Sequence, residues 1–255
     1  MTLISEIYKY LCELAPLELQ MNFDNAGFQI GRANREVDRV LLALDVTDDV
    51  VQEAKELGAG LIVSHHPLIF RAIKSIDGSD PEGERLLRLA ENDIAVISMH
   101  TNLDIADGGV NDVLVKLFDA DTIAALDKEN CGRVALLREK MALSDFLLIC
   151  KEKLDAKGLR YYDAGIPVHK IAVMGGAGGD SLDDAYNKTC DTYITSDIKY
   201  HQFLRAKELG INLIDADHFC TENPVIYALR EKLADKFCEA DFIISKKHRQ
   251  IINFI

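Results

Sequence analysis

The N-terminal segment carries apolar residues at helical spacing. Ile4, Ile7 and Leu11 recur every three or four positions, and mostly polar residues fill the places between them. This period is typical of an amphipathic helix with one buried face. Pro16 is poorly tolerated inside a helix, so we expect the helix to end just before it.

Short apolar runs farther along the chain predict buried strands, and the amphipathic segments between them predict helices. Strands are expected at residues 40–44, 61–63, 94–98, 134–137, 159–162, 171–174, 192–195, 212–214 and 241–244. Helices are expected at residues 47–57, 81–91, 200–209 and 224–237, with one more beginning at Ser144. This alternation predicts an α/β fold with mostly parallel sheets, in which ligands gather beyond the carboxyl ends of the strands.

One strand–helix–strand segment occurs twice. The letters AKELG at residues 54–58 return at residues 206–210, and an overlay without gaps also aligns Asp45 with Asp197 and His66 with His218. We therefore expect internally duplicated βαβ units. The predicted domains are a first α/β lobe over residues 1–125 and a second over residues 126–255, intimately joined and sharing one metal site.

Potential metal ligands follow the predicted strands. Two adjacent histidines end the first copy, a histidine and a glutamate four residues apart end the second, and an aspartate follows the strand at 94–98. These five side chains are His65, His66, Asp104, His218 and Glu222. Mixed imidazole and carboxylate donors suit Zn, Fe, Mn, Co or Ni, and five ligands exceed the usual set of one catalytic zinc. The sequence predicts a dinuclear site with two divalent transition-metal ions per chain.

A glycine-rich stretch at residues 175–179 follows a predicted strand and precedes a helical segment. That context fits either a loop that cradles phosphate or a tight turn. The stretch lacks the lysine and the Ser/Thr of a P-loop, so a tight turn is the favoured interpretation.

Composition limits the classes of partner that the protein can bind and indicates its compartment. The chain has 42 acidic and 29 basic residues, a net charge of −13, which opposes binding to nucleic acid. Charged residues interrupt the N-terminal apolar pattern, so it does not resemble a signal peptide, and no apolar run reaches the roughly 18 residues of a membrane span. The six cysteines include no C-x-x-C pair, which speaks against a disulfide framework or a thiolate zinc site. We expect a cytoplasmic protein.

Several motifs together resemble the Nif-three-like family, many of whose members are labelled GTP cyclohydrolase I type 2 homologues. The motifs lie at residues 23–31, 64–68, 100–104, 196–201 and 218–222. The resemblance implies a two-lobed α/β fold, a dinuclear metal centre made by the five candidate ligands, and a toroidal homohexamer whose sites face an internal cavity. The chain departs from the family in carrying Phe23 where tryptophan is usual, and it has no room for the inserted middle domain of longer relatives.

The resemblance also implies roles for residues beside the metals. Asp24 and Asn25 are expected to contact substrate, although Asp-Asn is equally common in ordinary turns. Tyr200 is expected to contact substrate and His201 to donate protons. His100 is expected to shuttle protons or to orient a ligand rather than to bind metal directly.

These expectations favour a metal-dependent hydrolase. A water activated by the metals would attack a small-molecule substrate, for which the family label suggests GTP, a related nucleotide-like or phosphorylated compound, or another cyclic amidine. The alternative is a ring-shaped metal-binding or regulatory protein without enzymatic activity.

Overall fold

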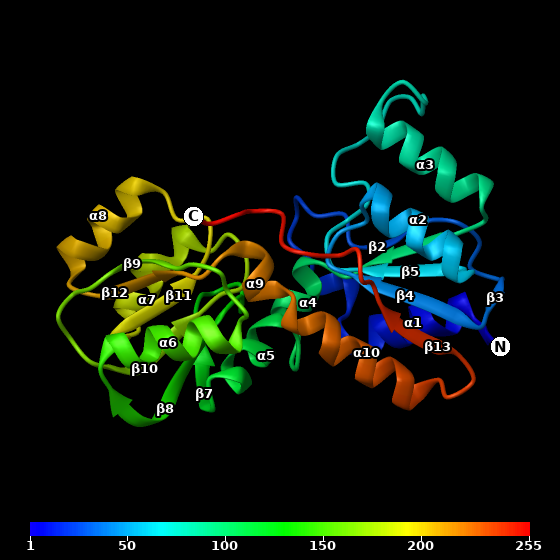
Figure 1. Ribbon diagram of the computed structural model, residues 1–255. Coiled ribbons are helices and arrows are strands. Elements are labelled where there is room, and N and C mark those ends of the chain that lie inside the picture. Colours follow the sequence, from blue (N-terminus) through cyan, green and yellow to red (C-terminus); the bar gives the residue numbers. More distant parts are fainter. The chain divides into compact units, whose positions relative to one another are not determined.

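The computed structural model describes residues 1–255, which divide into two compact units (Figure 1). The first unit contains Met1–Ala106 and Val225–Arg249, and the second contains Asp107–Pro224 and Gln250–Ile255. This division differs from the predicted lobes, because the second unit begins ahead of residue 126 and the chain returns to the first unit near its end. The return has a physical reason: the last strand, β13 (Asp241–Ile244), pairs with a strand of the first unit.

The first unit is built on a five-stranded sheet in the order β13-β4-β5-β6-β2. Its other strands are β4 (Arg39–Ala43), β5 (Leu61–Ser64), β6 (Ala95–Ser98) and β2 (Gly27–Ile30). All neighbours run parallel except β2, which is antiparallel to β6. A separate two-stranded pair joins β1 (Thr2–Leu3) to β3 (Glu36–Val37).

Helices cover both faces of this sheet, as Figure 1 shows. The helices α2 (Asp48–Leu57) and α3 (Pro81–Glu91) lie on one face, with α1 (Ile4–Leu14) and α10 (Pro224–Lys236) on the other. Because both faces are covered, β5 and β6 are buried along their whole length and read as continuous apolar runs in the sequence. Two short helices complete the unit, the 3₁₀ helix η1 (Leu17–Leu19) and α4 (Thr101–Ile105).

The second unit is built on a six-stranded sheet in the order β7-β8-β10-β11-β12-β9. The strands are β7 (Ala120–Ala125), β8 (Arg133–Met141), β10 (Val168–Val173), β11 (Thr192–Thr195), β12 (Asn212–Asp215) and β9 (Arg160–Tyr162). Only the β10–β11 and β11–β12 pairs are parallel. The predicted α/β class is confirmed, but this sheet is mixed where a mostly parallel one was expected.

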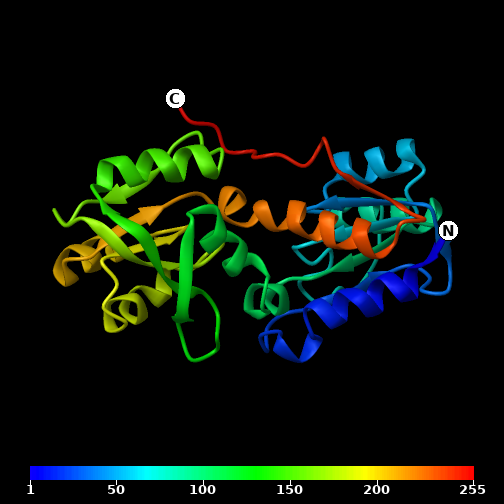
Figure 2. The same cartoon turned by 90° about the horizontal axis from the view of Figure 1, so that it is seen from below.

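The helices of the second unit also lie on both sides of its sheet. The helices α5 (Val110–Leu117) and α6 (Leu143–Lys153) enclose one core with the sheet, in which Leu114 and Phe146 are fully buried. Figure 2 shows α7 (Leu182–Asn187) on the side opposite α6. The remaining helices are α8 (Tyr200–Leu209), α9 (His218–Glu222) and the 3₁₀ helix η2 (Gly179–Ser181).

The sequence repeat corresponds to a structural repeat. The order β4-α2-β5 in the first unit matches β11-α8-β12 in the second, and in each the two strands are parallel neighbours. Both helices end at a glycine in the left-handed conformation, with φ of 67° at Gly58 and 68° at Gly210. Glycine closes a helix in this way without the steric cost that a Cβ would add.

None of the helices combines the length and the apolar character that crossing a membrane requires.

Candidate metal centre

Three imidazoles gather at the carboxyl ends of two strands in the first unit. His65 and His66 directly follow β5, and His100 follows β6. The ring centroid of His65 lies 5.1 Å from that of His66 and 5.2 Å from that of His100. One nitrogen from each of the three rings lies within 4.8 Å of the other two. Because β5 and β6 are parallel neighbours, their carboxyl ends meet at one edge of the sheet, which explains the convergence.

Each of these rings is held through its Nδ1 atom. His65 donates to the carbonyl oxygen of Met99 over 2.8 Å, and His66 pairs with the Asp45 carboxylate over 2.7 Å. A carbonyl or a carboxylate can only accept, so the proton lies on Nδ1 and the lone pair of a neutral ring lies on Nε2. Carboxylates and carbonyls hold metal-binding histidines in the same manner.

His100 is held by Asp24, which comes from a segment 76 residues away. The Nδ1 atom of His100 lies 2.7 Å from Oδ1 of Asp24, whose side chain is fully buried. Thr101 donates to the same carboxylate from its backbone N–H over 3.0 Å and also from its hydroxyl. Burial alone would raise the pKa of Asp24, but the hydrogen bonds from His100 and Thr101 and the charge of His100 outweigh burial and lower the pKa to about 2. Asp24 therefore stays ionised and fixes the orientation of His100.

Asp104 brings a carboxylate to the same cluster. It lies in α4, which follows His100, and its Oδ1 atom is 3.6 Å from Nε2 of the fully buried His65. That distance exceeds a normal hydrogen bond, so the two atoms approach without a direct N–H···O contact. The first unit thus combines three imidazoles and one carboxylate.

The second unit presents a histidine and a glutamate. His218 begins α9, and its Nε2 atom lies 3.1 Å from Oε2 of Glu222, one helical turn later. Its Nδ1 atom lies 2.8 Å from Oδ2 of Asp197, the residue that the repeat aligns with Asp45. The same Asp–His pair therefore occurs in both copies of the repeat.

The negative charge around His218 favours the binding of a cation. Burial by itself would lower the pKa of His218, but the hydrogen bonds and negative charges of Glu222 and Asp197 outweigh it and raise the pKa to about 9. An environment that retains a proton this strongly also attracts a metal cation, which must compete with that proton for the ring.

The glycine-rich stretch supports Glu222. A Cβ added to Gly176 would lie 2.1 Å from Oε1 of Glu222, and one added to Gly178 would lie 2.4 Å from Oγ1 of Thr195. The backbone N–H of Gly176 donates to Oγ1 of Thr221 over 3.0 Å. The stretch is therefore packed against β11 and α9, in agreement with the predicted tight turn.

The remaining predicted residues lie outside these two groups. Asn25 is exposed, and its side-chain amide donates to the carbonyl oxygen of Ile69 over 2.6 Å, so it links two loops. Tyr200 is 78% exposed at the start of α8, beside the exposed His201, and neither belongs to the clusters of donor atoms. The structure gives Asp24 a role as the partner of His100, which favours support of that ring over direct contact with substrate.

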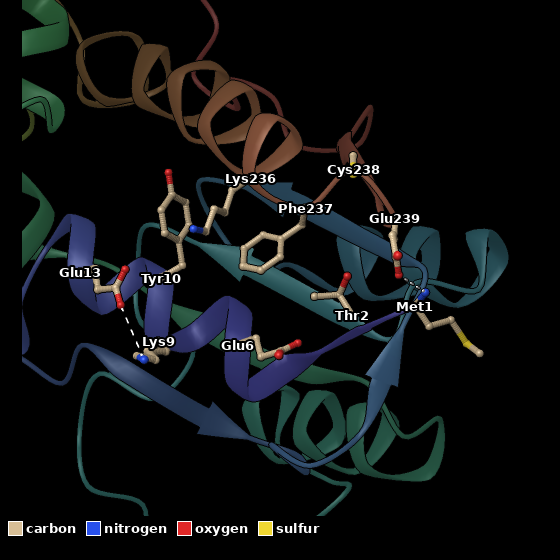
Figure 3. A pocket seen from close by; sticks show the side chains of 10 residues that line it. All are labelled: Met1, Thr2, Glu6, Lys9, Tyr10, Glu13, Lys236, Phe237, Cys238 and Glu239. Carbon is tan, nitrogen blue, oxygen red and sulfur yellow. Dashed lines mark hydrogen bonds and ion pairs between the residues drawn. The ribbon is translucent and has the colours of Figure 1, made fainter.

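A pocket of about 460 Å³ in the first unit is separate from this chemistry. It lies between α1 and the segment that follows α10, and charged side chains such as Glu6, Lys9 and Glu239 line it (Figure 3). Figure 3 also shows the ion pairs that span its rim, Lys9 with Glu13 and the N-terminal amine with Glu239. No candidate site residue lines the pocket.

The donor atoms fit divalent transition metals. They comprise imidazole nitrogens and carboxylate oxygens without cysteine sulfur, a set that suits Zn, Fe, Mn, Co or Ni more than Mg or Ca. Each of the four histidines, His65, His66, His100 and His218, has its Nδ1 atom engaged with an oxygen. The fold and this group of residues define an α/β protein with a candidate metal centre of histidines and carboxylates.

Comparison with known proteins identifies the family. The model of the Duf34/NIF3 family (NGG1p interacting factor 3) matches residues 2–250. The chain is 36% identical over 260 residues to a Clostridium perfringens protein named GTP cyclohydrolase 1 type 2 homolog, covering 99% of both chains. A Clostridium acetobutylicum protein of the same name is 34% identical over 90% of this chain and 89% of its own. The protein belongs to the Duf34/NIF3 family, as its motifs predicted.

Solved structures agree with this assignment. A Staphylococcus aureus hypothetical protein superimposes with a TM-score of 0.92 at 29% identity and covers 99% of both chains. A Bacillus cereus protein related to NIF3 superimposes with a TM-score of 0.90 at 26% identity and covers 100% of this chain and 99% of its own. The predicted fold is confirmed over the whole chain.

Proposed function

We propose that this protein is a metal-dependent hydrolase that uses two divalent transition-metal ions per chain. The ligands in this proposal are His65, His66, Asp104, His218 and Glu222. The observation that supports the proposal is that Nδ1 of each proposed histidine ligand is held by a carbonyl or carboxylate oxygen, the arrangement typical of histidines that bind a metal through Nε2.

The names of the relatives suggest the substrate. Proteins up to 36% identical to this chain are named GTP cyclohydrolase 1 type 2 homolog. We propose GTP or a related nucleotide-like or phosphorylated small molecule, with hydrolysis of a cyclic amidine as the reaction. When bound, the metals would supply Lewis-acid activation of water and stabilise the developing oxyanion.

The protein's own residues have separate tasks in this reaction. Asp45 and Asp197 would hold the ligand rings in the correct tautomer and orientation. His100, supported by the ionised Asp24, would move a proton between the attacking water and the leaving group. Tyr200 and Asn25 remain proposed substrate contacts, and His201 remains a proposed proton donor.

The test is a turnover assay on protein purified without oxygen and with its native metals. We expect hydrolysis of GTP or of another member of a panel of phosphoesters and cyclic amidines, and loss of turnover after chelation. A metal-loaded sample that is inert towards the whole panel would contradict the proposal.

A His100→Asn variant separates the enzyme from its non-enzymatic alternative. If His100 moves protons, turnover should fall by about 10²–10⁴-fold while both metals stay bound. Loss of metal along with activity would make His100 a ligand instead. If the His100→Asn variant lacks measurable turnover but still replaces the wild-type protein in cells, a metal-binding or regulatory role without catalysis would be favoured.

We also propose that the chain assembles as a toroidal homohexamer in the cytoplasm. Light scattering at several protein concentrations tests the assembly, and a stable monomer would contradict it.

A further inference from the structure

Two phenylalanines of the first unit lie exposed beside the three-histidine cluster. Phe23 is 63% exposed and Phe70 is 46% exposed. Their ring centroids lie 6.4 Å apart, and that of Phe70 lies 6.1 Å from that of His100. A row of aromatic rings therefore leads from solvent to His100.

The backbone beneath these rings is fixed, although the rings themselves face water. Asp24, next to Phe23, is held by Thr101, while Asn25 donates to the carbonyl oxygen of Ile69, next to Phe70. Gln29 accepts from the N–H of Ile69 over 3.2 Å and donates to the carbonyl oxygen of Asn25 over 2.6 Å. Two loops far apart in the sequence are thus tied together with their phenylalanines outward.

Exposure of these two rings to water is energetically unfavourable unless a ligand or partner covers them. Burying a phenylalanine side chain is worth roughly 1.5–3 kcal/mol, of which Phe23 forgoes the larger part and Phe70 a little under half. The rings meet at interplanar angles of 69° for Phe23 with Phe70 and 88° for Phe70 with His100, so neither pair is stacked face to face. Both rings keep a large exposed fraction, 63% for Phe23 and 46% for Phe70, and stacking of a flat ligand on an aromatic ring is worth about 1–3 kcal/mol per nucleobase.

We propose that Phe23 and Phe70 form an aromatic platform that stacks the planar heteroaromatic ring of the substrate next to His100. The inference rests on the proposed hydrolase and specifies its substrate class, namely compounds with a flat nitrogen heterocycle. Asn25 contributes to this platform by holding the two loops together.

The chain contains no tryptophan, so a Phe23→Trp variant provides a fluorescence reporter without background. Guanosine monophosphate should quench its emission saturably, whereas ribose 5-phosphate, which lacks the ring, should not. Tyr227→Trp is the matched control, because Tyr227 is 53% exposed on α10 and lies outside the platform. Adding Phe70→Leu to the reporter variant should weaken the apparent Kd by about fivefold or more.

Several outcomes would overturn the platform. Equal responses to the two ligands, or none at millimolar concentration, would contradict it. Emission that changes with protein concentration in the absence of ligand would show that a second copy of the chain covers these rings. Quenching without turnover of any substrate would keep the platform and reject the hydrolase. Turnover of a substrate without a ring, unchanged by Phe23→Leu, would keep the hydrolase and reject the platform.

Discussion

The two copies of the βαβ repeat share one Asp–His pair and differ in what completes it. In the first copy Asp45 holds His66, and in the second Asp197 holds His218, at distances of 2.7 and 2.8 Å. The residue before each histidine differs, since His65 of the first copy aligns with Asp217 of the second. His65 adds a buried imidazole, whereas Asp217 caps α9 by accepting from the N–H of Cys220.

This difference decides where the next candidate ligand comes from. The first copy has a parallel neighbour, β6, whose carboxyl end supplies His100 and leads into Asp104. The neighbour of β12 on that side is β9, which runs antiparallel and therefore brings its amino end to the same edge. The second copy obtains its carboxylate instead from the short helix that Asp217 starts. Duplication provided the Asp–His pair, and the surrounding topology determined the rest.

The largest effect should follow from removing the histidine that the copies share. His66→Ala and His218→Ala should each weaken metal affinity by more than about 100-fold, because a direct ligand matters more than its supporting partner. Competition with a chromophoric chelator measures the affinity. His169→Ala, on β10 outside both clusters, should leave it unchanged. An unchanged affinity in only one of the two variants would show that the copies are not equivalent.

A smaller effect is expected from the aspartates. Asp45→Asn and Asp197→Asn keep the shape of each pair but remove the charge that holds Nδ1–H, so each should lower metal affinity or turnover by about 10–100-fold. Similar losses in the two variants would support equivalent roles. If Asp197→Asn had no effect, the pair in the second unit would be an ordinary surface contact.

Gly176→Ala tests the packing of the glycine-rich stretch against Glu222. Alanine at a φ of +67° should cost about 1–2 kcal/mol of folding free energy, and the clash with the buried Glu222 should add about 1–3 kcal/mol. Gly165→Ala is the control, since its φ is +73° and a Cβ there meets nothing within 4 Å. Urea unfolding compares the two. Equal losses of unfolding free energy in the two variants would mean that the Glu222 side chain moves aside without an energetic penalty.

The smallest effect concerns the hydrogen bond between His248 and the backbone just beyond β4 in the first unit. His248, beyond β13, accepts from the N–H of Leu44 through Nδ1 over 2.8 Å, and burial lowers its pKa to about 4 despite the opposing charge of Asp45. Because the folded state disfavours the proton, this stabilisation is complete above the unfolded pKa of about 6.5 and is lost as pH falls towards 4. The urea midpoint of the wild type should therefore fall more between pH 7.5 and 5 than that of His248→Asn. Equal falls would contradict this.

Sequence reasoning predicted the local elements well and the long-range pairings poorly. The strand at Thr192–Thr195 and the helix at Tyr200–Leu209 have the bounds that their apolar periodicity predicted. The antiparallel pairing of β8 with β10 was not predicted, because an apolar run does not reveal the direction of its neighbour.

In the candidate site, too, local features were predicted and long-range contacts were not. The repeat aligned Asp45 with Asp197, and the strand ends identified the histidines, because both signals are local. The contact of Gly176 with Glu222 and that of Asp24 with His100 join residues distant in sequence, so neither could be derived from spacing. The family motif at residues 23–31 placed Asp24 beside the candidate centre, but it implied contact with substrate and not the support of His100 that the structure shows.

We propose that each chain holds a centre of two transition-metal ions. Elemental analysis of anaerobically purified wild-type protein tests it most directly. We predict two transition-metal ions per chain, and fewer in both His66→Ala and His218→Ala. Less than one ion per chain in the wild type, not restored by added metal, would contradict a two-metal centre.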